Sequence, residues 1–367
     1  MVGQWSTNST MAALLLSTNF TRIMTGIYRL LLASYVVIFH LSNVFPFAGQ
    51  VSVFAFYTIS GYLITLVVNG TYKGRIGLFF LNRAVRIYPT YWLCLAFSAL
   101  VVVSVGPEIV KLHKGLVLPQ GGDLWSNLFI FGLKGTTIRL LPPAWSLNTE
   151  LVYYLLMGLL LSHSRIIAAT WFCISVLLAM AVLGKPWEAA YFNFLFPSLA
   201  FATGTCLFYA KDLLAPASTY ASWVVFVLCS LFPLAPMLFE KCADIPLLKV
   251  VGSTHFLYMS PFVACAAVIA CNNLKIRSRF WKKFDKIAGD MSYPTFLIHW
   301  PVAGLLAHHV FGTWQKTPQL AFASLLGTWL VSLLIATTFE HQIAKIRDKL
   351  RPHRRLEALP TSNSPAA

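Results

Sequence analysis

Residues 319–339 read QLAFASLLGTWLVSLLIATTF, a stretch of 21 residues without a single charged side chain. A helix needs about 20 mainly apolar residues to cross the hydrocarbon core of a bilayer. Nine earlier stretches have a similar character, so the sequence predicts an all-α fold, a polytopic integral membrane bundle of about ten transmembrane helices. The ten predicted spans are 24–45, 50–69, 88–105, 145–162, 166–183, 191–210, 219–239, 250–271, 290–310 and 319–339.

The composition of the whole chain excludes the other broad classes of protein. Of its 367 residues 57% are hydrophobic and 11% are charged, whereas a typical soluble domain is about 25% charged. A soluble globule of this length would have too few charged side chains to cover its surface, and disordered chains need a polar majority. The seven Cys show no CxxC or zinc-finger spacing, so we predict neither a disulfide framework nor a metal site.

The net charge of +16 would suggest a nucleic-acid partner in a soluble protein, but in a membrane protein it mainly reports orientation. With ten spans, 20 of the 28 Lys and Arg residues, including Arg29, lie on the side that carries both termini. Because cytoplasmic loops are enriched in Lys and Arg, this split predicts cytoplasmic termini. We expect no nucleic-acid partner and a multi-pass protein of the bacterial inner membrane, whose oligomeric state the sequence leaves open.

The predicted spans divide the chain into three parts. We expect a cytoplasmic N-terminal segment at 1–23, a membrane domain at 24–340 and a basic cytoplasmic tail at 341–367. In the tail, residues 345–355 (KIRDKLRPHRR) are typical of an interfacial segment beside anionic lipid headgroups. The apolar run 124–133 is too short to cross a bilayer and predicts a re-entrant or interfacial segment.

Arg29 and His40 are ionisable residues inside the first predicted span. Such residues are costly in a membrane, which makes each a candidate for function. Eleven helical residues bring the chain back to the same face and advance it by about 16 Å. A neutral histidine is the usual general base. The alternative is that Arg29 extends to the headgroups while His40 makes a buried polar contact.

A second cationic group precedes the third predicted span, in RAVRIYP at 83–89. Arg83 and Arg86 lie on one helix face, and two guanidinium groups there could clamp a phosphate. Ordinary anchoring on the positively charged side of the membrane is the alternative. In the second span, Ser60 and the following glycine form a gap that either admits a ligand or allows close helix packing.

A carboxylate, Glu150, ends the segment WSLNTE at 145–150, and Tyr153 and Tyr154 follow it. Glu150 could position or deprotonate a hydroxyl group, or it could pair with a basic residue of another span. The ninth span holds Tyr293 and His299. Glu340 closes the tenth span, where interfacial and functional roles are both open.

These motifs, in this order, resemble those of integral-membrane acyltransferase family 3, which includes polysaccharide and nodulation-factor O-acetyltransferases. Each motif alone is weak, whereas the ordered set is specific. The matching elements are Arg29 with His40, FYTISGY at 56–62, RAVRIYP at 83–89, WSLNTE at 145–150 with the following tyrosines, and SYPTFLIH at 292–299.

The resemblance implies an acyl-CoA donor, usually acetyl-CoA, and no bound cofactor. It implies a carbohydrate or glycolipid acceptor, such as an exopolysaccharide, a lipopolysaccharide or a lipo-chitooligosaccharide nodulation factor; membrane lipids would be the other partners. On this reading His40 and Glu150 are catalytic, and Arg29, Arg83 and Arg86 bind the donor. The residues expected to contact the acceptor or to support the site are Ser60, Trp145, Tyr153, Tyr154, Tyr293 and His299.

Two other classes of function remain to be weighed. A transporter or flippase for a lipid-linked sugar or small solute predicts inverted repeats, and the two halves of the sequence show no such match. A non-enzymatic membrane interaction protein would leave the arginine, histidine and glutamate residues inside the spans unexplained. The sequence therefore favours the acyltransferase.

Overall fold

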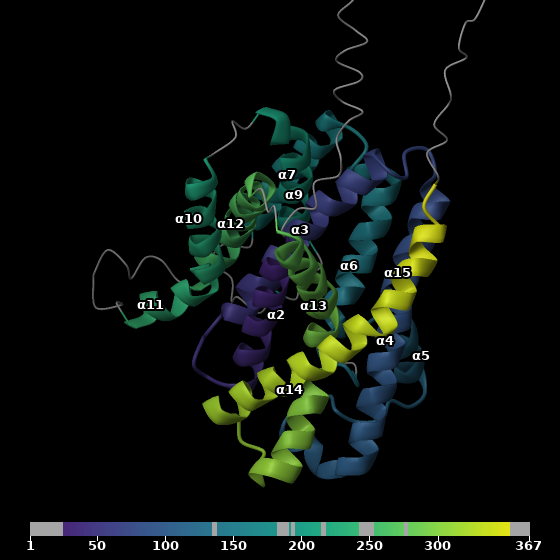
Figure 1. Ribbon diagram of the computed structural model, residues 1–367, viewed down its shortest axis with the longest axis vertical. Helices are drawn as coiled ribbons and strands as arrows, with labels where there is room; N and C mark the ends of the chain where they lie inside the picture. Colours follow the sequence, from purple (N-terminus) through teal and green to yellow (C-terminus); the bar gives the residue numbers. More distant parts are fainter. Residues whose placement is uncertain are drawn as a thin grey trace, which may run out of the picture.

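The computed structural model describes residues 25–133, 138–181, 191, 195–213, 218–241, 253–274 and 278–352. These residues form a bundle of helices and contain no strand (Figure 1). The longer helices are α2 (Thr25–Leu41), α3 (Ala48–Asn69), α4 (Ile76–Val105), α5 (Gly122–Phe129), α6 (Ala144–Leu156), α7 (Arg165–Ala181), α9 (Ser198–Ala210), α10 (Thr219–Leu231), α11 (Ala235–Lys241), α12 (Ser253–Asn273), α13 (Arg279–Leu306), α14 (Pro318–Thr337) and α15 (Phe339–Lys349).

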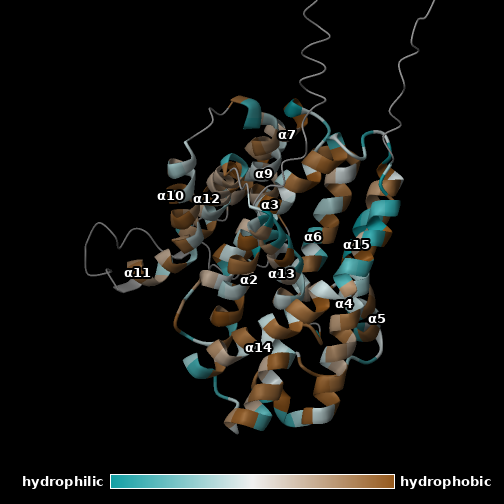
Figure 2. Cartoon of the chain, viewed as in Figure 1, coloured by the Kyte–Doolittle hydropathy of each residue, from teal (hydrophilic) through white to brown (hydrophobic). Residues whose placement is uncertain are grey.

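Six helical segments in the described part of the chain are long and apolar enough to cross a membrane. Hydrophobic residues dominate the outer sides of α4, α10 and α14 (Figure 2). Large apolar side chains such as Leu100 and Leu330 are each 70% exposed there, as expected where a helix faces lipid. The predicted all-helical membrane bundle is confirmed. The six segments are Ala48–Asn69, Ile76–Val105, Ala144–Leu161, Thr219–Phe239, His255–Asn273 and Pro318–Lys349.

Each of the ten predicted spans overlaps a helix in the described ranges. Helices α2 and α7 have 17 residues each, at the lower limit for a crossing, and α9 has 13, which is below it. The first turns of α13 carry several Lys and Arg residues, which lowers its hydropathy. The number of ten crossings and the side of the membrane on which the termini lie therefore stay predictions.

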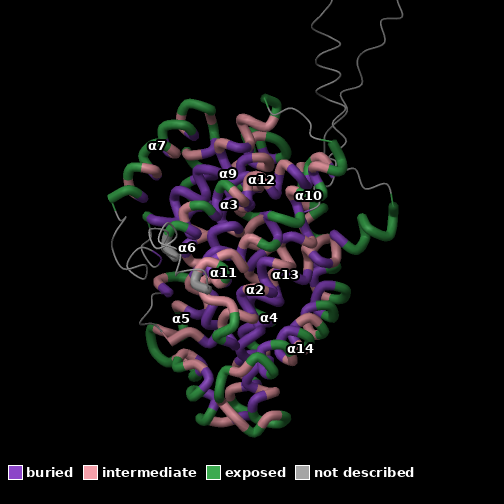
Figure 3. Tube along the Cα trace, turned by 90° about the vertical axis from the view of Figure 1, so that its left-hand side faces the viewer, coloured by how far each residue is buried: buried purple, intermediate pink, exposed green. Residues whose placement is uncertain are grey.

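The core of the bundle lies where α2, α3 and α13 meet (Figure 3). Helix α2 packs against α3, α13 and α14, and α3 also packs against α9 and α12. Buried side chains lie on opposite sides of α2, such as Leu32 and Ser34, which are about 200° apart around the axis. Burial on both sides explains why this helix lies inside the bundle. Figure 3 shows the exposed residues on the outer helices, among them α7 and α14.

Two glycines let the backbones of α3 and α9 approach closely. A Cβ atom added to Gly61 would lie 2.3 Å from the carbonyl oxygen of Phe201, and one added to Gly204 would lie 2.0 Å from that of Thr58. Small residues permit such contacts between membrane helices. Gly61 therefore serves packing, whereas the neighbouring Ser60 lies on another face of α3 and borders a cavity described below.

The short helix α5 contains most of the apolar run 124–133 and lies beside α4 (Figure 1). Its eight residues cannot cross a bilayer. Three aromatic side chains of α4 donate hydrogen bonds to backbone carbonyl oxygens near the C-terminal end of α5. Carbonyl groups in the last turn of a helix have no partner within the helix. The bonds are Tyr88 to Phe129 at 2.9 Å, Tyr91 to Asn127 at 2.6 Å and Trp92 to Leu128 at 2.9 Å.

Helix α15 contains the first part of the basic tail and packs along α4 (Figure 1). Thr90 Oγ1 donates a hydrogen bond of 2.6 Å to Glu340 Oε1. Asn82 Nδ2 donates one of 3.2 Å to the backbone carbonyl of Arg347. These contacts continue the packing of the membrane domain past the predicted boundary at residue 340, and residues 353–367 lie outside the described ranges.

The close contact between α3 and α9 predicts that Gly61→Ala destabilises the protein by about 1–3 kcal/mol, because the added methyl group meets backbone atoms that cannot rotate away. The measurement is the thermal unfolding midpoint of the purified protein in detergent. Gly77→Ala is the matched control, because no heavy atom lies within 4 Å of the added carbon. Equal midpoints for the two variants would contradict this description of the contact.

Candidate active site

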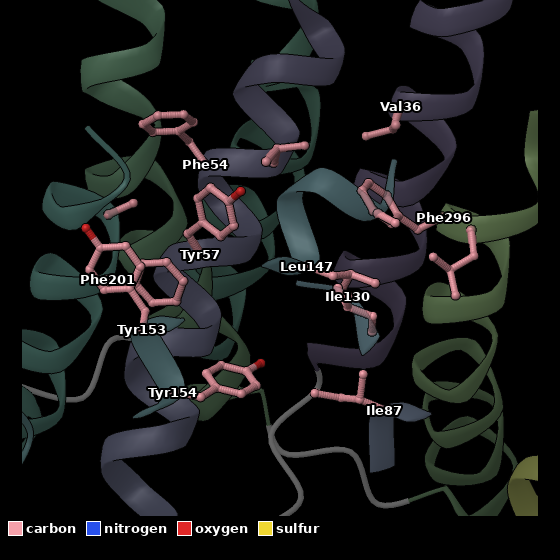
Figure 4. Packing of buried hydrophobic residues seen from close by; sticks show 14 of the residues in the cluster. Val36, Phe54, Tyr57, Ile87, Ile130, Leu147, Tyr153, Tyr154, Phe201 and Phe296 are labelled. Carbon is pink, nitrogen blue, oxygen red and sulfur yellow. The ribbon is translucent and has the colours of Figure 1, made fainter. Parts of the chain in front are cut away.

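A cavity of about 230 Å³ lies between α2, α3, α4, α6, α13 and α15. Arginine residues from three helices border it, and we call it the arginine cavity. They are Arg29 on α2, Arg83 and Arg86 on α4, and Arg347 and Arg351 at the C-terminal end of α15 and just beyond it. Figure 4 shows part of its wall, including Ile87, Leu147, Tyr154 and Phe296.

Four of these arginines have no acidic side chain within 4.0 Å, since the salt bridges found in the described residues are Lys111–Glu108 and Arg351–Asp348. The Nε atoms of Arg83 and Arg347 are buried without a hydrogen-bond partner. Buried charge without a partner is costly. The cavity is therefore suited to an anion, and guanidinium groups bind phosphate through paired hydrogen bonds.

Glu150 contributes a negative charge to the same cavity. Its Oε1 accepts a hydrogen bond of 2.5 Å from Ser60 Oγ and another from the Tyr154 hydroxyl. The carboxylate also acts electrostatically on Arg29 and Arg83. The structure thus places Glu150 with the arginines, and its hydrogen bonds go to Ser60 and Tyr154 rather than to His40.

His40 borders a second cavity of about 160 Å³, which we call the histidine cavity. Gln50 and Trp145 also line it. Three residues line both cavities: Val53, Ser146 and Phe296. The two cavities are therefore neighbours across a wall of three side chains. Arg29 lies on one side of this wall and His40 on the other, in keeping with their shared face of α2.

The His40 imidazole makes no hydrogen bond with any residue in the described ranges. It stacks against His299 with 5.3 Å between the ring centroids. His299 is fully buried, and its Nδ1 lies 2.9 Å from the Phe296 carbonyl oxygen. Because a carbonyl can only accept, Nδ1 carries the proton, and Nε2 keeps a lone pair without a partner. An unpartnered imidazole such as His40 can accept a proton from a hydroxyl group.

His113 follows α4 in a loop, and its ring lies 4.6 Å from that of Trp300, which also contacts His40. Burial, followed by the nearby Arg139 and Lys316 cations, lowers the pKa of His113 to about 4. Its Nδ1 accepts a hydrogen bond of 2.9 Å from the Gly115 backbone N–H. His113 is therefore neutral at pH 7 and adds no positive charge beside the histidine cavity.

Three further residues had a predicted role in the site. Tyr293 lines the arginine cavity, and its hydroxyl donates a hydrogen bond of 3.2 Å to the Ile87 carbonyl. Trp145 lines the histidine cavity. Tyr153 borders neither cavity; it stacks on Phe201 with 4.4 Å between ring centroids (Figure 4). Its position favours a role in packing α6 against α9.

Sequence reasoning missed several residues of the two cavities, among them Gln50, Phe296 and Arg347. One signal for Arg347 is its spacing from Glu340. Residues 340, 343 and 347 follow a helical period, and Glu340 and Ile343 are buried. If the helix is assumed to continue past the last span, this period predicts that Arg347 faces the bundle. No cluster of three or more potential metal ligands occurs within the described residues.

The sequence of the chain matches a known family of proteins. Residues 27–337 match the family described as "Acyltransferase domain", acyltransferase family 3. The chain belongs to this family. The resemblance seen in the ordered motifs is thus confirmed, and the protein is a membrane acyltransferase.

A similar protein comes from Aquifex aeolicus (strain VF5) and bears the name "Uncharacterized protein". It is 27% identical over 213 residues, which make up 57% of this chain and 90% of that protein. No solved structure matches the chain. The roles of individual residues in the family member described here therefore rest on its own geometry.

The charge balance of the arginine cavity predicts that Glu150→Gln tightens the binding of inorganic pyrophosphate by about tenfold, because it removes a negative charge beside Arg29 and Arg83. Isothermal titration calorimetry of the purified protein measures this affinity. Glu108→Gln, which changes an exposed carboxylate paired with Lys111, should leave the affinity unchanged. Unchanged affinity in Glu150→Gln would show that anions do not bind beside Glu150.

Proposed function

We propose that this acyltransferase moves an acyl group, acetyl in the first instance, from cytoplasmic acyl-CoA to a hydroxyl group of a carbohydrate acceptor. One observation carries the proposal: four guanidinium groups without a carboxylate partner border a cavity whose wall is shared with the cavity of His40. Acyl-CoA has the matching chemistry, since it carries phosphate groups at one end and a thioester at the other. We infer that it lies across the two cavities.

In this arrangement Arg29, Arg83 and Arg86 hold the phosphate groups. The arm that bears the thioester passes Val53, Ser146 and Phe296, the residues shared by the two cavities. The arginine cavity would face the cytoplasm, because the predicted topology puts most of the Lys and Arg residues on that side. The thioester then enters the histidine cavity and comes close to His40.

His40 would act as a general base on the acceptor. As the hydroxyl oxygen attacks the thioester carbonyl carbon, its proton passes to His40, the carbon–sulfur bond breaks, and the proton is returned to the sulfur of CoA. The other route open to His40 is a transient acyl-imidazole. Its nitrogen attacks the thioester carbonyl carbon, the carbon–sulfur bond breaks, and the imidazole N–H proton passes to the sulfur of CoA. The acceptor hydroxyl oxygen then attacks the acyl carbon, the carbon–nitrogen bond breaks, and the hydroxyl proton returns to the imidazole. Apolar walls such as Phe296 and Val53 limit hydrolysis by excluding water.

An acceptor rich in hydroxyl groups suits the histidine cavity. Gln50 Oε1 is buried there without a hydrogen-bond partner, so it is ready to accept a hydrogen bond from a hydroxyl. The Trp145 ring borders the same cavity. The acceptor classes that the family suggests are exopolysaccharides, lipopolysaccharides and lipo-chitooligosaccharide nodulation factors, all consistent with a bacterial inner-membrane enzyme.

His40→Ala should abolish acyl transfer while leaving donor binding intact, because it removes the base and none of the arginines. The assay uses purified protein in lipid vesicles, radiolabelled acetyl-CoA and a glycan acceptor. His309→Ala, a change to an exposed histidine, is the matched control and should retain activity. Near-normal turnover in His40→Ala would overturn the assigned role. Donor binding without turnover in the wild-type protein would instead favour transport or sensing.

Arg83→Ala should raise the KM for acetyl-CoA by roughly 10–100-fold with a smaller change in kcat, because a charge-assisted hydrogen bond to phosphate contributes about 1.5–3 kcal/mol. Initial rates at varied donor concentration measure both constants. Lys73→Ala is the matched control, because it removes a basic residue from the exposed loop before α4, on the same predicted side of the membrane as Arg83. It should leave the KM unchanged. If Arg83→Ala keeps the wild-type KM, the donor phosphates bind elsewhere.

A further inference from the structure

The basic segment after the last predicted span is typical of a lipid anchor in sequence, but the structure turns part of it inward. Arg347 and Arg351 line the arginine cavity, whereas the neighbouring Lys345 and Lys349 are exposed. In a helix, residues two positions away from Arg347 lie about 200° around the axis from it. Helix α15 therefore divides its basic side chains between the cavity and the surface.

Two hydrogen bonds hold α15 in this orientation. Near its first turn Glu340 accepts from Thr90, and near its last turn the Arg347 carbonyl accepts from Asn82. The two anchor points are seven residues apart, about 10 Å along the helix. Both partners lie on α4, the helix that carries Arg83 and Arg86. The backbone of α15 at Arg347 is thus held against the helix that carries two of the other arginines.

The electrostatics of Arg347 call for an anion in the cavity. Its Nε is buried without a hydrogen-bond partner. Arg86 and Arg83 act on it as like charges, whereas Glu340, the acidic group that acts on it, is already hydrogen-bonded to Thr90. Arg351 differs from Arg347, because its side chain is 56% exposed and forms a 3.0 Å ion pair with Asp348. Arg351 therefore marks the mouth of the cavity, and Arg347 lies just inside it.

We propose that α15 is part of the donor site and that Arg347, assisted by Arg351, binds the outermost phosphate of the donor. This inference rests on the proposed function. If the thioester must reach His40, the nucleotide end of the donor is the last part to enter, and its ribose 3′-phosphate lies nearest the mouth. The inner arginines, Arg29, Arg83 and Arg86, are then left to bind the diphosphate. Helix α15 would select for the 3′-phosphate rather than anchor the protein to lipid.

The test compares acetyl-CoA with acetyl-3′-dephospho-CoA as donors for the wild-type protein, Arg347→Gln and Lys349→Gln in neutral phosphatidylcholine vesicles. The wild-type protein should prefer acetyl-CoA by roughly 10–100-fold in kcat/KM, the range expected for a charged hydrogen-bonded contact. Arg347→Gln should lose most of this preference through a higher KM for acetyl-CoA, with kcat little changed. Lys349→Gln should keep the preference.

The lipid alternative predicts a different pattern. If Arg347 binds headgroups, its replacement will matter only in vesicles that contain phosphatidylglycerol, and it will affect both donors equally. That result would overturn the proposal. Thermal unfolding of each variant reports whether it is folded. If Arg347→Gln does not fold, Arg347→Lys replaces it, because it keeps the charge, loses the paired hydrogen bonds and should show a reduced preference.

Failure of this inference is distinguishable from failure of the proposed function. If Arg83→Ala raises the KM for both donors while Arg347→Gln keeps the wild-type preference, the donor site stands and α15 has no part in it. If Arg83→Ala also keeps the wild-type KM for both donors, the arginine cavity does not bind the donor. Either result would contradict the role proposed for α15.

Discussion

The chemistry of this bundle centres on a cluster of guanidinium groups around a cavity whose lining contains one carboxylate, Glu150. Charged side chains buried inside a membrane bundle without an opposite charge nearby are costly. Helices α2, α4 and α15 nevertheless bring Arg29, Arg83, Arg86 and Arg347 to the same cavity. The positive charges of these arginines repel one another, and a bound anion would remove this repulsion. Such an arrangement is typical of a binding site rather than of a structural core.

The second feature of the architecture is the wall between the two cavities. Val53, Ser146 and Phe296 come from three different helices, α3, α6 and α13. The arrangement separates a charged region, suited to phosphate groups, from an apolar region that holds an imidazole without a hydrogen-bond partner. In the proposed reaction, the donor is held by its charged end while its thioester reaches a place from which water is excluded.

Much of this organisation could be predicted from periodicity within single helices. The spacing of Arg29 and His40 places both on one face of α2, and the two residues border neighbouring cavities. The apolar stretches predicted the helices, because length and hydropathy are properties of each segment alone. The ordered motifs predicted the family for the same reason, since their order is contained in the sequence.

Contacts between distant segments could not be predicted in this way, because a single sequence does not report how one helix is rotated against another. The hydrogen bonds of Glu150 to Ser60 and Tyr154 depend on the packing of α3 against α6. The composition of the basic tail predicts an interfacial segment beside lipid headgroups, whereas the inward position of Arg347 depends on the packing of α15 against α4, which includes the contacts with Asn82 and Thr90.

The most direct test is an experimental structure in lipid nanodiscs with a thioether analogue of acetyl-CoA, which cannot be cleaved. We predict that its phosphate groups contact Arg29, Arg83 and Arg86, and that its acyl end passes Phe296 to lie within about 4 Å of the His40 ring, in reach of proton transfer. Phosphate groups bound outside the arginine cavity, or an acyl end directed away from His40, would contradict the mechanism.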